Sequence, residues 1–271
     1  MMHSPMPSPL LVFLRRSVCV LLLVLPQSIL NADQIRVRYT EGVIRGFLIV
    51  DGEHGEHIGD GDLAQVAEGD RVTTHLTIRF KDGSLFDDKT VFSQRRVFHL
   101  LTDHVIQKGP SFKQPLETII NASTGQVTVR YTDDSGKSKE ITQHMQIPAD
   151  VANGAVIFTV IKDIQPGAAP TTLSYVAATP KPRLVKLVIT QQGEDTFITG
   201  ASQRRAIHYV MHIDIGGVAG VVAPLVGKKP ADSDLWVIPG DAPAFVGFQG
   251  QLSEGGPIWR MNLESPVPAK Q

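Results

Sequence analysis

A seven-residue stretch with two arginines and a histidine occurs twice in the chain, at Ser93–His99 and at Ser202–His208, with five of seven positions identical. An arginine and a nearby histidine can bind an anionic group such as a phosphate or a carboxylate, because both side chains donate hydrogen bonds. The same residues also suit solvated strand positions that keep a sheet from pairing edge to edge, so both interpretations stand. The candidate ligand-binding residues of the repeat are Arg95, His99, Arg204 and His208.

A second polar segment, Glu53–Asp62, contains six carboxylate or imidazole side chains within ten residues. Ligands of this kind can hold a hard or borderline cation, but the spacing matches no known metal-binding loop, and a solvated polar loop has the same composition. His208 and His212 have the spacing of a zinc-binding helix, yet on a strand four residues span roughly 13 Å. We therefore assign no metal ligand and no cofactor.

Motifs of the common enzyme classes are missing from the sequence. Gly136-Lys137-Ser138 lacks the earlier glycine of a phosphate-binding loop, because Tyr131 stands in its place. The chain has no Gly-x-Ser-x-Gly, His-Glu-x-x-His or Gly-x-Gly-x-x-Gly motif. Cys19, the only cysteine, lies in the predicted signal peptide, which excludes thiol chemistry and disulfides from the expected mature chain. No catalytic residue is assigned, and the sequence favours a protein that is not an enzyme.

The first 32 residues predict a signal peptide. Arg15-Arg16 form a basic region, Val18–Leu25 form an apolar core that is too short to span a bilayer, and Ala32 suits the cleavage point. Cleavage there leaves 24 basic and 27 acidic residues, a net charge of −3, with no block of one sign that would attract nucleic acid. We expect a periplasmic or extracellular protein with no transmembrane helix and no nucleic-acid partner.

The remaining chain has the pattern of strands around one short helix. Val72–Phe80 alternates between apolar and polar residues, which is typical of a half-buried antiparallel strand, and Asp82-Gly83 predicts the hairpin turn after it. Ile35–Val50 predicts one or two strands, whereas Asp51–Asp70 predicts a long loop. Pro148–Asp150 predicts a helix start with Asp150 as the cap.

The repeat and the hairpins define the predicted fold class. In each half a strand, a glycine turn at Gly83 or Gly193 and a second strand lead into the Arg-Arg pair, and Ser202–Ile215 alternates so that its apolar set faces the core. The sequence therefore predicts a mainly β protein, with a large curved antiparallel sheet or half-barrel, pseudo-repeated halves and about one short helix. The predicted organisation is a signal peptide (1–32), a single β domain (33–266, with a first half 33–165, a joint 166–182 and a second half 183–266) and a tail (267–271).

A glycine-rich segment and four aromatic residues late in the chain are candidates for contact with an apolar ligand. Gly216–Val226 carries no charge and is compatible with a close-packed turn, a cavity lining or a membrane-contacting flap. In an open half-barrel the four aromatic side chains would line the cavity. They are Trp236, Phe245, Phe248 and Trp259.

Turns and packing positions form a layout that extends over most of the chain. Its parts are Asn121–Val127, Gly136-Lys137, Ile147-Pro148 with Asp150, Asn153-Gly154, Gly216–Pro230, Trp236 and Gly256–Arg260. This layout resembles that of uncharacterised exported bacterial antiparallel β-sheet proteins with a domain of unknown function. The resemblance implies a β fold and gives no residue a catalytic role. A weaker architectural similarity is to periplasmic lipoprotein carriers, whose curved sheet covers an apolar cavity.

Three functional hypotheses follow. The first is an exported, non-enzymatic protein that binds a lipid or another apolar or amphipathic ligand, or an envelope partner protein, through a concave sheet. The second is a metal-dependent hydrolase that uses the loop of residues 53–62. The third is a structural or assembly protein whose free sheet edges pair with another chain.

Overall fold

The computed structural model describes residues 1, 34–133, 135–199, 202–215 and 230–264. Its contacts divide the chain into Met1–Asn31 and a unit of Ala32–Gln271, which contains every element named below. The predicted signal peptide beyond Met1, the glycine-rich segment 216–226 and the tail 267–271 lie outside the described residues. No helix within the described ranges is long and apolar enough to cross a membrane.

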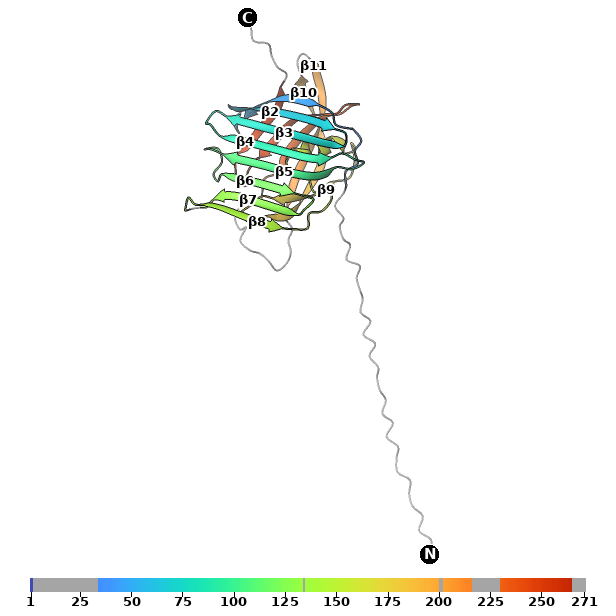
Figure 1. Ribbon diagram of the computed structural model, residues 1–271. Coiled ribbons are helices and arrows are strands. Elements are labelled where there is room, and N and C mark those ends of the chain that lie inside the picture. The colour runs from blue at the N-terminus through green and yellow to red at the C-terminus, as the bar shows by residue number, and fades with distance from the viewer. Residues whose placement is uncertain (2–33, 134, 200–201, 216–229, 265–271) are drawn as a thin grey trace. The chain divides into compact units, whose positions relative to one another are not determined.

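Fourteen strands in the described ranges form one antiparallel sheet (Figure 1). The first half contains β1 (Ile44–Asp51), β2 (His57–Glu68), β3 (Arg71–Phe80), β4 (Leu85–Ser93), β5 (His99–Lys108), β6 (Leu116–Asn121), β7 (Gln126–Thr132) and β8 (Ser138–His144). A helix, α1 (Val156–Asp163), separates it from β9 (Thr171–Ala177), β10 (Arg183–Thr199), β11 (Ser202–Asp214), β12 (Ser233–Ile238), β13 (Ala244–Gln251) and β14 (Ile258–Glu264).

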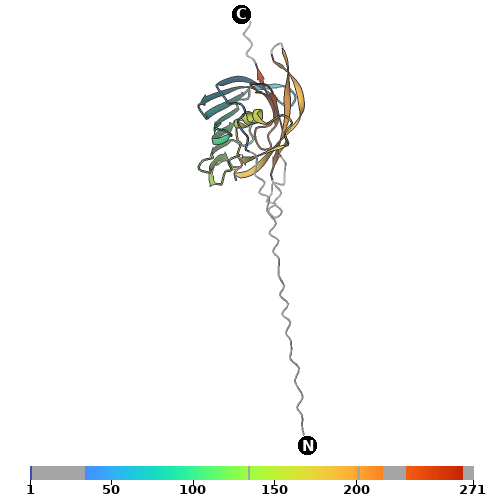
Figure 2. The ribbon, with the colours of Figure 1, turned by 90° about the vertical axis from the view of Figure 1, so that its right-hand side faces the viewer.

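The strand order makes two meanders. It runs β8-β7-β6-β5-β4-β3-β2-β1-β14-β13-β12-β11-β10-β9, so neighbours in sequence are neighbours in the sheet, and the two meanders join where β1 pairs with β14. In Figure 1 the strands of the first half cross the front of the unit, and those of the second half run steeply behind them. Figure 2 shows α1 between these two layers. The predicted large antiparallel sheet with one short helix is confirmed, and among the described strands no ladder closes β8 onto β9.

Alternation along the strands determines which side chains fill the space between the layers. In β3 every second side chain is buried, as the pattern of Val72–Phe80 predicts. The same holds for the apolar face of β11, where Ile207, Tyr209 and Met211 are buried. The core is therefore built from the inner faces of both layers and from the apolar side of α1.

The predicted loop 51–70 is wrong, because β2 occupies most of it. Gly59 faces inward so closely to β3 that an added Cβ would lie 2.8 Å from the Arg79 carbonyl oxygen, and Asp60 faces solvent. The glycines and acidic residues that suggested a loop are therefore the tightly packed face and the solvated face of one strand.

The two copies of the repeated heptapeptide occupy different structural positions. Ser93 ends β4 and His99 begins β5, so the first copy is a connection, in which Arg96 has a φ of 66°. The second copy lies within β11, and Gly193, predicted as a turn, lies at a register shift inside the continuous strand β10. The prediction of equivalent strands is wrong, because seven matching residues do not determine whether the backbone continues or turns.

The helix begins later than predicted. Gly154 has a φ of 61°, which ends the extended segment before it, and α1 starts only at Val156. Asp150 is not the cap; its carboxylate accepts a hydrogen bond of 2.8 Å from the backbone N–H of Ser174 in β9. The residues before α1 therefore pair with the sheet instead of starting a helix.

The edge of β9 is covered by that same segment. The Asn153 side-chain amide donates to the Val176 carbonyl and accepts from the Val176 N–H, both at 2.9 Å, as a neighbouring strand would. β9 itself lies within residues 166–182, which the sequence pattern predicted as a joint. At the opposite end of the sheet, β8 presents exposed Lys139 and Glu140, charges that discourage edge-to-edge association.

Candidate functional site

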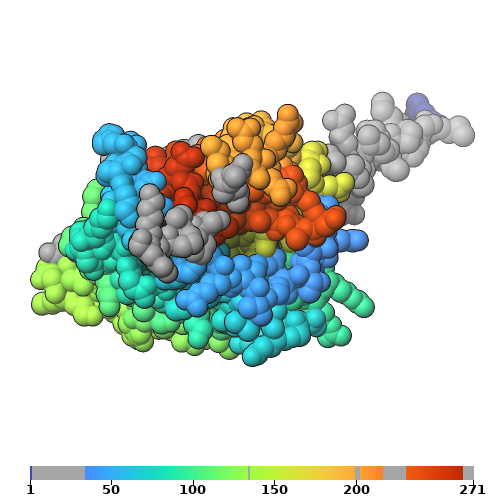
Figure 3. All heavy atoms as spheres, turned by 90° about the horizontal axis from the view of Figure 1, so that it is seen from above, coloured from blue at the N-terminus to red at the C-terminus, as the bar shows by residue number. Residues whose placement is uncertain are grey.

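A cavity of about 230 Å³ lies between the two layers, beside the first turn of α1. Figure 3 shows a hollow between the first-half residues drawn in blue and the second-half strands drawn in orange and red, whereas the residues that line the cavity begin at Leu76 and include none of those drawn in blue. Protein interiors contain few voids larger than a water molecule, and an apolar cavity of about 150 Å³ is enough to bind benzene. The apolar wall comes from both layers and the helix: Leu76, Phe86, Val105, Ile120, Ile157, Phe158, Leu187, Met211 and Phe248.

Two aspartates on neighbouring strands, Asp88 of β4 and Asp103 of β5, lie in the buried part of this wall, and we refer to them as the carboxyl pair. Each is 2 % exposed. The Thr90 hydroxyl lies 2.8 Å from the nearer oxygen of Asp88 and 3.0 Å from that of Asp103, and it accepts a hydrogen bond of 2.9 Å from the Ala155 N–H. Gly154 passes so close that an added Cβ would lie 2.2 Å from an Asp103 oxygen. The turn before α1 therefore closes over the pair.

Burial changes the protonation of the pair. It raises the pKa of Asp88 to about 6. Burial, followed by the negative charge of Asp88, raises the pKa of Asp103 well above its ordinary value of 3.8. Two buried carboxyls in contact do not both ionise readily, so the pair shares a proton near neutral pH. Burial, with a smaller effect of the two aspartates, raises the pKa of Tyr175 in the opposite layer to about 12.

Two further polar groups of the cavity wall lack hydrogen-bond partners within the described part of the chain. They are the hydroxyl of Thr118, a residue 2 % exposed, and the Nε of Arg183. Buried polar atoms in proteins are nearly always paired, so an unpartnered group on a cavity wall indicates a ligand or a water. The wall is thus apolar over most of its area, with a few polar groups that can orient a ligand.

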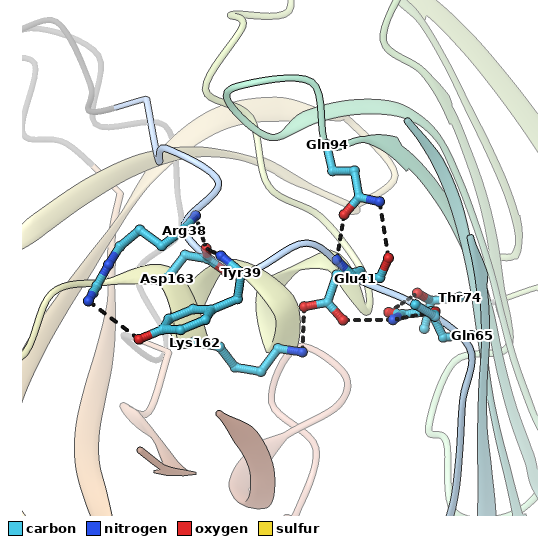
Figure 4. A network of polar contacts seen from close by, with 9 residues as sticks. Arg38, Tyr39, Glu41, Gln65, Thr74, Gln94, Lys162 and Asp163 are labelled. Atoms are coloured by element: carbon cyan, nitrogen blue, oxygen red, sulfur yellow. Dashed lines mark hydrogen bonds and ion pairs between the residues drawn. The ribbon is translucent and has the colours of Figure 1, made fainter. Parts of the chain in front are cut away.

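A second polar cluster, shown in Figure 4, has a different character. Lys162 of α1 pairs with the buried carboxylate of Glu41 at 2.6 Å, and Gln65 donates to the other Glu41 oxygen at 2.7 Å. Thr74 donates to the Gln65 side chain at 3.1 Å, and the Gln94 side chain binds the backbone N–H and C=O of Glu41 at 2.6 and 3.1 Å. The charges of Glu41 and Lys162 are paired with each other, so this cluster fastens α1 and the chain before β1 to the sheet.

Asp163, the last residue of α1, adds to this attachment. One of its oxygens accepts hydrogen bonds from the backbone N–H groups of Arg38 and Tyr39 (Figure 4). Burial raises the pKa of Asp163 to about 6. The segment that follows the predicted signal peptide is therefore tied to the helix end.

The predicted anion-binding residues lie apart from the cavity. Arg95 is exposed, with Asp70 3.8 Å away, and His99 Nδ1 lies 3.1 Å from the Ala149 carbonyl oxygen. Arg204 is exposed on β11. None of these three residues contributes to the cavity wall.

His208 and Trp236 come together on the outer face of the second half. Their rings stack at 5.0 Å with an interplanar angle of 14°. His208 Nε2 lies 2.7 Å from an Asp234 oxygen, and the Trp236 N–H donates to Asp195 at 2.7 Å. Trp236 is 7 % exposed and belongs to a small cluster with Val246, so this pair packs the outer face.

Of the other predicted aromatic residues, only Phe248 lines the cavity. Phe245 stacks on Phe158 of α1 with a centroid distance of 4.3 Å. Trp259 packs against Phe80 at 4.7 Å. Phe245 and Trp259 are thus part of the core that supports the cavity.

The sequence did contain a signal for the carboxyl pair. In β4 the inward positions are Phe86, Asp88, Thr90 and Phe92, so an aspartate interrupts an otherwise apolar face. On β5 buried Asp103 shares its face with Val105 and with buried Gln107. A charged residue on the apolar face of an alternating strand is the pattern that would have identified the site.

Metal binding has no comparable cluster: across the described ranges, no three His, Cys, Asp or Glu side chains are arranged to hold an ion. His57 of β2 lies 3.7 Å from an Asp51 oxygen and 3.3 Å from an Asp60 oxygen, at a solvent-exposed position. The loop required by the hydrolase hypothesis is a short turn and a strand.

Comparisons with known proteins give structural similarities only. No family model matches the chain, and no curated protein matches it. The structure is similar to a crystal structure of a beta-barrel-like protein with a domain of unknown function from Brucella abortus, with 9 % identity, a TM-score of 0.46, and coverage of 82 % of this chain and 95 % of that chain. It is also similar to the hypothetical lipoprotein YmcC from Escherichia coli, with 9 % identity, a TM-score of 0.36, and coverage of 83 % and 85 %. At these TM-scores the similarities carry no conclusion about function.

Proposed function

We propose that this protein is an exported, non-enzymatic binding protein, periplasmic or extracellular, that holds a small apolar or amphipathic ligand in the cavity of its curved sheet. The observation that carries the proposal is the 230 Å³ space, with walls from both layers and from α1. Ligand sites are typically concave and mostly apolar, with a few convergent polar groups, and this cavity has that composition.

The size of the cavity limits the ligand. Typical ligand pockets occupy about 300–1,000 Å³, so this cavity suits a small molecule or the end of a longer one. The described cavity wall includes exposed Ile215 and Glu254 at one side, where a longer ligand could extend into solvent.

Native mass spectrometry of the purified protein, together with thermal unfolding in the presence of 1-octanol, tests this proposal. We expect a bound small molecule, or a rise in melting temperature that saturates with octanol concentration. Bare protein together with no thermal shift from octanol would contradict the proposal.

A cavity-filling variant locates the site. Val105 is one of the apolar residues of the cavity wall, and Val105→Phe should abolish the octanol effect by occupying the space. The matched control is Val66→Phe, at a position that is 48 % exposed on the outside of β2, which should keep the effect. Octanol binding that survives Val105→Phe unchanged would place the ligand elsewhere.

A further inference from the structure

We propose that the ligand of the cavity is an amphipathic amine, whose ammonium group binds over Val105 between the carboxyl pair and the Thr118 hydroxyl. This inference rests on the proposed function, since it specifies the chemical class of the ligand in the same cavity. It is carried by the arrangement of three acceptor groups around one position of the wall.

The strand register places these groups. On the central strand β5, Val105 faces the cavity, and Asp103 is two residues earlier on the same face. Asp88 of β4 is directly opposite Val105 on one side, and Thr118 of β6 is directly opposite it on the other. Neighbouring strands are about 4.8 Å apart, so a small group above Val105 lies within reach of all three side chains.

The carboxyl pair lacks a cation of its own. No ion pair joins Asp88 or Asp103 to a basic side chain in the part of the chain that the structure describes, and the Thr90 hydroxyl that contacts both is neutral. Buried carboxylates elsewhere in the same molecule are treated differently, since Glu41 pairs with Lys162. A positively charged ligand group would supply the missing partner.

Thr118 is the independent indication of a ligand. Thr118 belongs to the cavity wall, and its buried hydroxyl has no hydrogen-bond partner among the described residues. If the carboxyl pair served only to anchor α1, that role would explain the hydrogen bond between Thr90 and the Ala155 N–H and the close approach of Gly154. It would not explain why the Thr118 hydroxyl is buried without a partner among the described residues.

An ammonium group fits the chemistry of this set. It has three N–H donors and no acceptor, which matches two carboxyls and one hydroxyl that can each accept a hydrogen bond. A carboxylate or phosphate head group would face the negative pair and be repelled. Arg183 also lines the cavity, and it is the group that an anionic ligand would use instead.

Isothermal titration with three probes of equal chain length, octylamine, 1-octanol and octanoate, tests the inference at neutral pH and below their micelle concentrations. We expect octylamine to bind at least about tenfold more tightly than either other probe. If none of the three binds, the proposed function itself fails. If octanol binds as tightly as the amine, or octanoate binds best, the cavity function stands and the amine assignment is overturned.

Substitutions of Asp103 and Thr118 test whether these cavity-wall residues cause the preference for octylamine over 1-octanol. Asp103→Asn should reduce the ratio of amine to octanol affinity to within about threefold, because a neutral amide replaces a carboxyl. Thr118→Val should also lower that ratio, and it removes an unpartnered buried hydroxyl, so the variant is expected to fold. The matched control is Thr196→Val on the exposed face of β10, which should keep the parent ratio. An unchanged ratio in Thr118→Val would overturn the assignment even if Asp103→Asn does not fold.

Discussion

The carboxyl pair predicts that folding stability falls as the pH rises from 4 to 8. An aspartate has an ordinary pKa of 3.8, whereas burial raises the pKa of Asp88 in the folded protein to about 6. Between these values the folded protein binds more protons than the unfolded chain. The stabilisation is therefore complete below the unfolded pKa and is lost as the pH rises through the folded pKa. The difference corresponds to about 3 kcal/mol for Asp88 alone, and the raised pKa of Asp103 acts in the same direction.

The double variant Asp88→Asn/Asp103→Asn isolates this effect, because asparagine has the shape of aspartate and does not titrate. Urea unfolding followed by the fluorescence of buried Trp236 and Trp259 gives the free energy of unfolding at each pH. From pH 4 to pH 8 we expect the parent to lose about 3 kcal/mol or more relative to the double variant.

Groups that titrate in both proteins cancel in this difference. The control is Asp241→Asn, which replaces an exposed carboxylate and should follow the parent across the whole range. A double variant that loses stability with pH as steeply as the parent would show that the pair holds no proton, and it would refute the reasoning.

Three more changes test the packing around the site by urea unfolding. Gly154→Ala should lower the free energy of unfolding by about 2–4 kcal/mol, since the position has φ +61° and the added Cβ meets the carboxyl pair. Gly136→Ala is the control; its φ is +77° but the position is in open space, so it should lower the free energy of unfolding by only about 1 kcal/mol. Lys162→Met should lose about 3–5 kcal/mol because Glu41 is left buried and unpaired, and adding Glu41→Gln to that variant should recover part of the loss. Asn153→Ala should lose about 2–4 kcal/mol because two backbone groups of β9 lose their partners; a loss below 0.5 kcal/mol would mean that water replaces the amide.

Much of the fold could be predicted because alternation is a local signal. Val72–Phe80 gave both the strand and its buried face, since one polar and one apolar residue in turn fit only a half-buried strand. The loop prediction for Asp51–Asp70 was wrong because Asp60 lies on the solvent side of β2, whereas Gly59 and Gly61 lie on its packed side. The composition of the segment combines the residues of both faces of β2, so it does not reveal the alternation of a strand.

The site was harder to predict, because it depends on pairing between strands. The carboxyl pair is separated by fifteen residues in sequence and meets only through the register of β4 and β5. The eight residues chosen from the sequence were selected by type and local repetition, and only Phe248 reaches the cavity. Arginine and histidine are chemically versatile, but burial and convergence decide whether such groups act together.

Burial alone does not distinguish a functional carboxyl from a structural one, and the two buried acidic sites of this molecule show the difference. Glu41 is buried to 7 % exposure, yet both its oxygens have partners and its charge is neutralised by Lys162. The carboxyl pair is more buried and belongs to the cavity wall, as does Thr118, whose hydroxyl has no partner among the described residues. Of the four buried side-chain atoms without a hydrogen-bond partner among the described residues, two belong to residues of the cavity wall, Thr118 and Arg183, and they are the reason to seek the ligand there.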